Sequence, residues 1–391
     1  MTEKQVKLAV IGVGAMGSSH ARDIETIPQT QLVAVCDLIS ERAECIAQKY
    51  GCAFYTDYKD MLDNLELDAV IIATPHAAHT PISIECLKRD IHVLTEKPLA
   101  VHVLDGEKMR DAYQLALSEK PDLKFGIMFQ QRTYGYWKSV KEMLENGNLG
   151  KIMRVTWIIT DWFRTQTYYD NGGWRASWRG EGGGVLLNQC PHNLDLLQWF
   201  VGMPARIHGF AKLGKYHNIE VEDEVTAYFE YANGAIGHFI TSTAESPGTN
   251  RLEIIAEMGK LVVEKEKITF WQNNSSSIHE IKSSPNPYNL VENEEKDITF
   301  THHGTPGHRL MIENFANAIL YQEPLIAPAI EGLNQLQLSN AIMLSSFLNQ
   351  PVDIPIDATL YKNEILERAK NSKIQTIKLK SNPFDASKSF R

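Results

Sequence analysis

The chain is poor in cysteine, has no long apolar run and carries no excess of positive charge. Its five cysteines form no C-x-x-C pair, so neither a disulfide framework nor a zinc site is expected, and the reducing cytoplasm is the expected location. No stretch approaches the roughly 18 apolar residues that are needed to cross a membrane. The apolar run at residues 8–13 is also too short for a secretory signal peptide.

The balance of charged residues excludes a further class of function. Lys and Arg number 39 against 48 Asp and Glu, which gives a formal net charge of −9. This acidic excess argues against a dedicated nucleic-acid-binding protein. With 43% hydrophobic residues the chain can bury a sizeable core, which excludes disorder on the scale of a domain. At roughly 100–200 residues per domain, a chain of this length suggests two or three domains.

The first 125 or so residues alternate short apolar runs with amphipathic stretches. This order is typical of βαβ units and a parallel sheet. The pattern predicts strands at residues 8–12, 32–37, 69–73, 92–95 and 124–128, and helices that include 40–50 and 81–89.

Beyond residue 130 strand-like runs dominate, and they predict an antiparallel sheet. Asn233-Gly234 between two such runs is a two-residue hairpin signal. We expect a dinucleotide-binding domain at 1–128, a substrate-binding and oligomerisation domain at 129–365, and a C-terminal tail at 366–391. The pattern predicts strands at 152–162, 225–231, 235–243, 252–256, 261–263 and 268–271, an irregular segment at 272–300, and helices at 136–145, 308–321 and 329–349.

A glycine motif lies between the first predicted strand and the next helical pattern. Gly12, Gly14 and Gly17 match G-x-G-x-x-G in the context that binds dinucleotides. The first glycine permits the tight turn, the second lets a pyrophosphate approach the backbone, and the third lets helix and strand pack closely. Ala15 and Met16, which complete the motif, place their backbone N–H groups at the helix N-terminus, where phosphates bind.

Asp37 lies 20 residues after Gly17, at the end of the second predicted strand. A carboxylate there can accept hydrogen bonds from the adenosine ribose hydroxyls, and it repels a 2′-phosphate. Leu38 and Ile39 follow it, in place of the Ser/Arg pair that favours that phosphate. We therefore expect NAD as the cofactor, with NADP less favoured.

Three further motifs follow in order along the chain. They are Thr74-Pro75 with His79 after the fourth apolar strand, Glu96-Lys97-Pro98, and the run from Gly182-Gly183-Gly184 to His192-x-x-Asp195. In order and spacing they resemble the Gfo/Idh/MocA oxidoreductase family, over the chain up to about residue 360. The resemblance implies an α/β protein with an N-terminal Rossmann domain and a C-terminal α+β domain that has a large open, mostly antiparallel sheet. It also implies that Thr74, Pro75, His79, Glu96 and Lys97 contact the cofactor.

The same resemblance implies a catalytic pair, Lys97 at the nicotinamide edge and His192 facing it across the substrate. The chemistry asks for such a pair, because hydride can leave a secondary alcohol only if the hydroxyl proton leaves as well. A histidine, with an ordinary pKa of about 6.5, suits the role of the base. A neighbouring ammonium lowers the cost of developing alkoxide charge.

One position departs from the inositol dehydrogenase pattern, which has Asp where this chain has Asn188. Asparagine can hydrogen-bond a sugar hydroxyl but cannot relay a proton, so proton transfer would depend more on His192. If helical geometry reaches back this far, Asn188 and His192 share a face at i, i+4. Asp195 is expected to orient the helix or a neighbouring group.

Aromatic and guanidinium side chains gather before the three glycines. Aromatic faces match the C–H faces of sugars, and guanidinium groups match their hydroxyls. Arg132 and Tyr134 lie where the family places substrate contacts. His302, His303 and His308 lack carboxylates at ligand spacing, so no metal is expected. The candidates before the glycines are Trp162, Arg164, Tyr168, Trp174, Arg175, Trp178 and Arg179.

Together these features predict an NAD-dependent dehydrogenase of a cyclic polyol or pyranoside, which forms a homodimer or homotetramer through its open sheet and has no nucleic-acid or membrane partner. One alternative is a glycosidase that oxidises C3 transiently so that elimination cleaves the glycosidic bond. Another is a non-catalytic sensor of sugar or dinucleotide, which the presence of both Lys97 and His192 disfavours.

Overall fold

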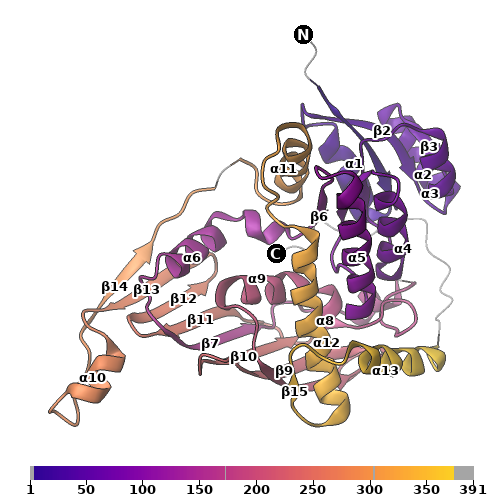
Figure 1. The fold of residues 1–391 in the computed structure, drawn as a ribbon. Coiled ribbons are helices and arrows are strands. Elements are labelled where there is room, and N and C mark those ends of the chain that lie inside the picture. Colours follow the sequence, from indigo (N-terminus) through magenta and orange to yellow (C-terminus); the bar gives the residue numbers. More distant parts are fainter. Residues whose placement is uncertain (1–3, 172, 303, 374–391) are drawn as a thin grey trace.

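Two β-sheets, each with its own helices, organise the protein (Figure 1). The computed structural model describes residues 4–171, 173–302 and 304–373, so most of the predicted tail and His303 lie outside the described residues. The first sheet has six strands in the order β3-β2-β1-β4-β5-β6, all parallel. Its strands are β1 (Val6–Ile11), β2 (Thr30–Cys36), β3 (Ala53–Tyr55), β4 (Ala69–Ile72), β5 (His92–Thr95) and β6 (Phe125–Ile127).

Burial on both faces explains why these strands are apolar throughout. In β4 and β5 every residue is buried, which requires helices on both sides of the sheet. The βαβ crossovers supply these helices, and the order of the strands confirms the predicted Rossmann arrangement. The helices are α1 (Ala15–Ile24), α2 (Ser40–Tyr50), α3 (Tyr58–Asn64), α4 (His76–Leu87) and α5 (Val103–Glu119).

The second sheet has nine strands in the order β14-β13-β12-β11-β7-β10-β9-β8-β15. Each pair is antiparallel except β10 with β7, which confirms a mostly antiparallel sheet. The strands are β7 (Ile152–Ile159), β8 (Arg206–Leu213), β9 (Glu222–Glu230), β10 (Ile236–Ser242), β11 (Asn250–Ala256), β12 (Gly259–Glu264), β13 (Lys267–Asn273), β14 (Asn293–Ile298) and β15 (Val352–Asp353).

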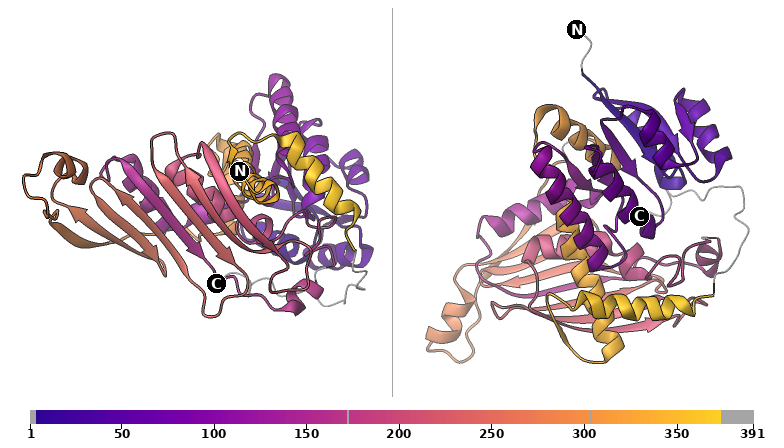
Figure 2. Two further views of the ribbon diagram at one scale, coloured as in Figure 1. Left: turned by 90° about the horizontal axis from the view of Figure 1, so that it is seen from below. Right: turned by 45° about the vertical axis from the view of Figure 1, so that its right-hand side comes forward.

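Helices cover one face of this sheet and leave the other open (Figures 1 and 2). Buried and partly exposed residues alternate along β9, as expected for a strand with one covered face. The covering helices are α6 (Gly135–Glu145), α9 (Pro191–Val201) and α12 (Gly332–Leu348). The remaining short elements are η1 (Gln130–Thr133), α7 (Gln166–Asp170), α8 (Val185–Asn188), α10 (Ser277–Ser283) and η2 (Ala329–Glu331).

Two late helices bear on the predicted domain boundaries. Helix α11 (His308–Tyr321) lies beside α1 of the first domain, and the backbone N–H of Ile127 bonds the carbonyl of Ala327 at 3.0 Å. Part of the segment assigned to the second domain therefore packs on the first. Helix α13 (Ala358–Lys370) runs through the predicted boundary at residue 365.

Some local predictions need correction. The Asn233-Gly234 hairpin forms, but its loop is longer than two residues, because Tyr231 N–H bonds the carbonyl of Ala235 and only Gly234 has a positive φ. Residues 272–300, expected to be irregular, contain α10 and β14. Among the described residues no helix is long and apolar enough to cross a membrane.

Candidate active site

The glycine turn joins β1 to α1 as the motif predicts. A Cβ atom at Gly17 would overlap the carbonyl oxygen of Gly12, so only glycine allows this packing. At Gly14 a Cβ would meet no atom within 4 Å, which leaves open space beside the backbone. Gly14 also provides no side-chain cap for α1, so the first N–H groups of the helix are available to an anion. The turn therefore fits a dinucleotide pyrophosphate.

Two polar side chains border this turn. The Asp37 carboxylate accepts hydrogen bonds from the backbone N–H groups of Val13 and Ile39, both at 2.9 Å, which fixes it beside the turn. The hydroxyl of Thr74 is buried and has no partner among the described residues. Both groups fit the predicted cofactor site, because a bound dinucleotide offers hydroxyls and phosphates as partners.

His79 does not fit the predicted contact with the cofactor. Its ring is fully buried, and its nitrogens lie 2.9 Å from the carbonyl oxygen of Thr74 and 2.8 Å from that of Pro98. The ring therefore ties the loop after β4 to the loop after β5, and no ring nitrogen remains for the cofactor. Pro75, its neighbour in the motif, is the N-cap residue of α4.

Glu96 is held by a histidine that no motif indicated. His20 Nε2 lies 2.8 Å from Glu96 Oε1, and the backbone N–H of Lys97 donates to the other oxygen at 3.1 Å. Burial by itself raises the pKa of Glu96, but the hydrogen bond and charge of His20, with the charges of His308 and Lys97, lower it to about 2. Glu96 is thus an ionised carboxylate next to Lys97.

Lys97 is half-buried and carries an ammonium without a direct ion pair. Its Nζ donates to the backbone carbonyl of Asn188 at 2.7 Å, and no carboxylate of the described residues lies within 4.0 Å of it. Burial lowers the pKa of Lys97, and the negative charge of Glu96 partly opposes this effect. The remaining N–H groups can donate to a substrate oxygen.

His192, the predicted base, has a buried imidazole. It is 3% exposed, and neither ring nitrogen has a partner among the described residues. Burial lowers its pKa well below the usual value, and the positive charge of Lys97 adds to the effect. A buried polar group normally has a partner, so an unpaired imidazole whose pKa is lowered by the charge of Lys97 is a candidate for binding or catalysis.

Asn188 differs from the expectation in two ways. Helix α8 ends at Asn188 and α9 begins at Pro191, so Asn188 and His192 do not share a helix face. The side-chain amide of Asn188 donates to the carboxylate of Glu181, and that N–H is not available to a substrate. Sequence reasoning missed Glu181 because it belongs to no recognised motif.

The glycine run before α8 packs against β9. A Cβ at Gly184 would overlap the carbonyl oxygen of Glu222, and the Glu222 carboxylate accepts hydrogen bonds from the N–H groups of Gly184 at 2.8 Å and Leu186 at 3.1 Å. Burial raises the pKa of Glu222 to about 7. This contact fixes the start of α8.

Five of the predicted aromatic and guanidinium residues form one stacked cluster. Arg175 lies 5.1 Å from the ring centre of Tyr168 and 4.9 Å from that of Trp174, which packs against His76 at 5.0 Å. Arg164 lies over Tyr168 at 5.1 Å and over Trp162 at 5.5 Å.

The cluster borders the Lys97 site. The side chain of Gln189, next to Asn188, donates to the Tyr168 hydroxyl at 3.2 Å. Trp178 and Arg179 lie elsewhere, because the first packs on Phe347 and the second bonds backbone carbonyls of α13.

Arg132 is a structural residue and not the predicted substrate contact. Its side chain is 2% exposed; it bonds both oxygens of Asp195, at 2.8 and 2.6 Å, and Glu331 at 2.5 Å. These partners lie 63 and 199 positions away, so the sequence did not reveal them. Tyr134 packs against the rings of Tyr136 and His302.

Replacing Arg132 with methionine should therefore make the protein easier to unfold, because it leaves the buried Asp195 carboxylate without its cationic partner. We expect a loss of about 3–5 kcal/mol in the free energy of unfolding, measured by urea denaturation. Arg206→Met, which breaks an exposed pair with Asp353, is the control and should unfold like the wild type. A stability loss in R132M no larger than in the control would contradict this assignment.

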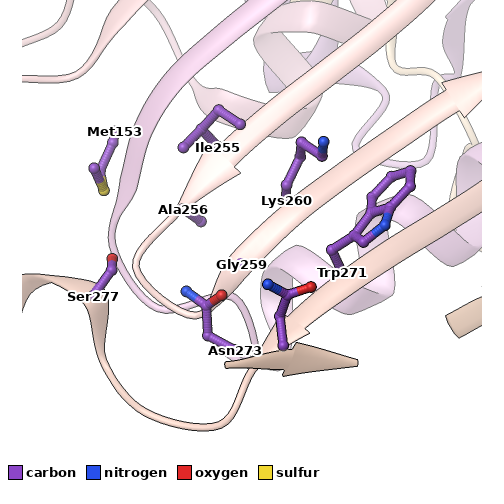
Figure 3. A pocket seen from close by; sticks show the side chains of 9 residues that line it. Met153, Ile255, Ala256, Gly259, Lys260, Trp271, Asn273 and Ser277 are labelled. Carbon is purple, nitrogen blue, oxygen red and sulfur yellow. The ribbon is translucent and has the colours of Figure 1, made fainter. Parts of the chain in front are cut away.

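A search for metal-binding groups and pockets among the described residues adds nothing to the site around Lys97. No group of three or more His, Cys, Asp or Glu side chains in that part of the chain could hold a metal ion. A pocket of about 370 Å³ opens on the second sheet, and Figure 3 shows Lys260 and Trp271 among its lining residues. None of the residues that line it belongs to the site around Lys97.

Comparisons with known proteins agree with this geometry. The profile of the oxidoreductase family with an NAD-binding Rossmann fold matches residues 6–116, and the GFO/IDH/MocA C-terminal domain matches residues 137–262. Inositol 2-dehydrogenase of Rubrobacter xylanophilus is 28% identical over 265 residues, which cover 66% of this chain and 72% of that protein.

Two solved structures are similar over almost their whole length. WlbA dehydrogenase of Chromobacterium violaceum, in complex with NADH and UDP-GlcNAcA, is 26% identical with a TM-score of 0.78 and coverages of 91% of this chain and 98% of that one. The Bordetella pertussis WlbA dehydrogenase, with the same ligands, is 25% identical with a TM-score of 0.75 and coverages of 90% and 100%. The glycine turn, the order of both sheets and these matches agree that the chain belongs to the Gfo/Idh/MocA family of NAD-dependent oxidoreductases.

Proposed function

We propose that this protein oxidises a secondary hydroxyl group of a cyclic polyol or pyranoside, with His192 as the base and Lys97 as the group that stabilises the alkoxide. The observation that carries the proposal is the pair itself, a half-buried ammonium and a buried imidazole. An ammonium after β5 and an unpaired imidazole on α9 come from different domains, close enough for the charge of Lys97 to lower the pKa of His192.

The residues present have the properties that the reaction requires. Bound NAD, held at Gly14, Asp37 and Thr74, supplies the hydride acceptor. The neutral imidazole of His192 takes the hydroxyl proton. The ammonium of Lys97 donates a hydrogen bond to the same oxygen as its charge develops, and burial strengthens that interaction. The carbonyl of Asn188 holds the ammonium in place.

The substrate class is inferred from the site and from relatives. A cluster of Trp162, Trp174 and two guanidinium groups borders the site, and such surfaces suit the C–H faces and hydroxyls of a ring. The relatives named above are an inositol dehydrogenase and dehydrogenases solved with a sugar nucleotide. Both kinds of molecule contain ring carbons with secondary hydroxyls.

A panel of inositols and pyranosides, incubated with the protein and NAD, tests the proposal. Net NADH formation, followed at 340 nm, is expected with at least one of them. Release of an aglycone from a glycoside without net NADH would instead indicate the glycosidase alternative. Neither product with any compound of the panel would contradict the proposal.

The pH dependence of kcat follows from the two pKa shifts. His192 must be neutral to accept the proton, and its pKa is lowered, so activity should persist below pH 6.5 and decline only in more acidic solution. Lys97 must be protonated, and its lowered pKa should make kcat fall before pH 10.5 is reached. The measurement is log kcat against pH at saturating NAD and substrate. An acidic limb centred above pH 6.5 would contradict the role of His192.

We also propose a homo-oligomer that buries the open face of the second sheet, and a cytoplasmic location. The open face supports the first, because a large uncovered sheet with exposed side chains such as Phe210 suits a second subunit. All five cysteines are free, as suits a reducing compartment. Light scattering of the purified protein tests the oligomer, and a monomer at all concentrations would contradict it.

A further inference from the structure

Glu181 is a buried carboxylate that no motif indicates and the mechanism above does not use. It is 1% exposed and directly precedes the glycine run. Its carboxylate accepts hydrogen bonds from the backbone N–H of Ala176 at 2.8 Å and from the side-chain amide of Asn188. Its backbone carbonyl accepts a hydrogen bond from His76 at 3.1 Å. Glu181 thus connects three segments around the site.

Asn188 links this carboxylate to the catalytic lysine. Its side chain is fixed by Glu181, and its backbone carbonyl accepts the hydrogen bond from Lys97 Nζ at 2.7 Å. Lysine is a flexible chain that ends in a point charge, so its position depends on a fixed acceptor. Holding the Asn188 side chain also holds the peptide group that fixes the ammonium.

We propose that Glu181 is a positioning residue for Lys97, which it holds in place through Asn188. The inference rests on the function proposed above. Glu181 has a second effect through its charge, because it lies near enough to raise the pKa of Lys97. The titratable and charged groups around Lys97 are Glu96, Glu181, Arg175, Cys190, His76, His79, His192 and His308.

The variant Glu181→Gln removes one of the two acceptor oxygens and the negative charge of Glu181. Its amide has one oxygen for two N–H donors. When that oxygen accepts from Ala176, its NH₂ group faces Asn188, whose amide must turn over to accept it, and the Asn188 NH₂ group then loses its acceptor. The negative charge near Lys97 is lost as well. We expect kcat to fall at least about tenfold, with the KM for NAD unchanged, and the alkaline limb of the pH profile to move to lower pH. The acidic limb, set by His192, should stay in place.

Exchanging the carboxylate at position 181 with the amide at position 188 should restore the hydrogen bonds between the two side chains. Asn188→Asp alone brings two carboxylates together, and kcat should fall. In the double variant E181Q/N188D the glutamine oxygen accepts from Ala176, its NH₂ group donates to the new aspartate, and one negative charge remains near Lys97. We expect a kcat within about threefold of the wild type and recovery of the alkaline limb. A purely structural role for Glu181 would not move that limb.

Glu222→Gln is the matched control. It removes another buried carboxylate that accepts two backbone N–H bonds beside the same glycine run, but it touches neither Asn188 nor Lys97. Thermal unfolding and NAD binding of all variants are measured on the full chain. E222Q should destabilise the protein and leave the alkaline limb in place.

An activity-independent readout separates this inference from the proposed function. The pKa of Lys97 can be followed by NMR of the ¹³Cε signals of ¹³C-labelled lysines, with Lys97→Ala used to assign its signal. It should be lower in E181Q than in the wild type whether or not a substrate is known. An unchanged Lys97 pKa and alkaline limb in E181Q would overturn the inference, as would a double variant no better than either single one. If E181Q does not fold, the kcat and the alkaline limb of the double variant test the inference instead: recovery supports it, and no recovery overturns it.

Discussion

Replacing Lys97 or His192 with alanine is expected to lower kcat for ring-alcohol oxidation by about 10²–10⁴-fold. General acid–base catalysis by a positioned side chain contributes about this much, and a donor to a developing oxyanion contributes a similar amount. The double variant should lose little more than the worse single variant, because the two groups act on one oxygen. The KM for NAD should change little. Stopped-flow measurement of NADH formation at saturating substrate gives the rates.

Matched surface variants test whether these losses are specific. Lys88→Ala removes an exposed lysine at the end of α4, and His279→Ala removes an exposed histidine on α10. Both should retain wild-type kcat. If Lys97→Ala or His192→Ala also turned over a proven substrate at the wild-type rate, the catalytic pair would be wrongly assigned.

Asp37→Ala is expected to shift the cofactor preference from NAD towards NADP. The carboxylate lies at the end of β2, fixed by the N–H groups of Val13 and Ile39, where it can bond ribose hydroxyls and repel a 2′-phosphate. A hydrogen bond to a charged group is worth about 1.5–3 kcal/mol, so kcat/KM for NAD should fall about 10- to 100-fold. The value for NADP should rise or stay level, because the repulsion is removed.

The measurement is the ratio of kcat/KM for the two cofactors with the same substrate. Asp60→Ala, at an exposed position on α3, is the control and should keep the wild-type ratio. Because Asp37 also bonds the glycine turn, thermal unfolding checks that the variant is folded. An unchanged ratio in a folded D37A protein would contradict the role given to Asp37.

Sequence reasoning predicted the first domain well because its signals are local. The predicted strand at 92–95 and the predicted helix at 40–50 match β5 and α2. An apolar run and an amphipathic pattern each lie within a single element, so the sequence of that element is enough to predict it. Strand β3 was missed, because it has three residues and none is fully buried. Strand β8 was missed because its alternation is weak and exposed residues dominate its end.

The site was predictable only in part, for a related reason. Motif spacing indicated the glycine turn, and the family resemblance implied the roles of Lys97 and His192. Partners that meet only in the folded chain carry no such signal. Arg132 pairs with Asp195 and Glu331, which lie in distant segments of the chain, and Glu96 pairs with His20, which lies on α1. Glu181 is only seven positions from Asn188, but its role depends on how the glycine run turns.

The central claim is that an ammonium and an imidazole from different domains act on one ring oxygen beside bound NAD. A crystal structure of the protein with NAD and a substrate found in the panel tests it most directly. The reacting oxygen is expected within hydrogen-bond distance of both Lys97 Nζ and a ring nitrogen of His192, with its carbon facing the nicotinamide. A complex in which either side chain points away from that oxygen would contradict the claim.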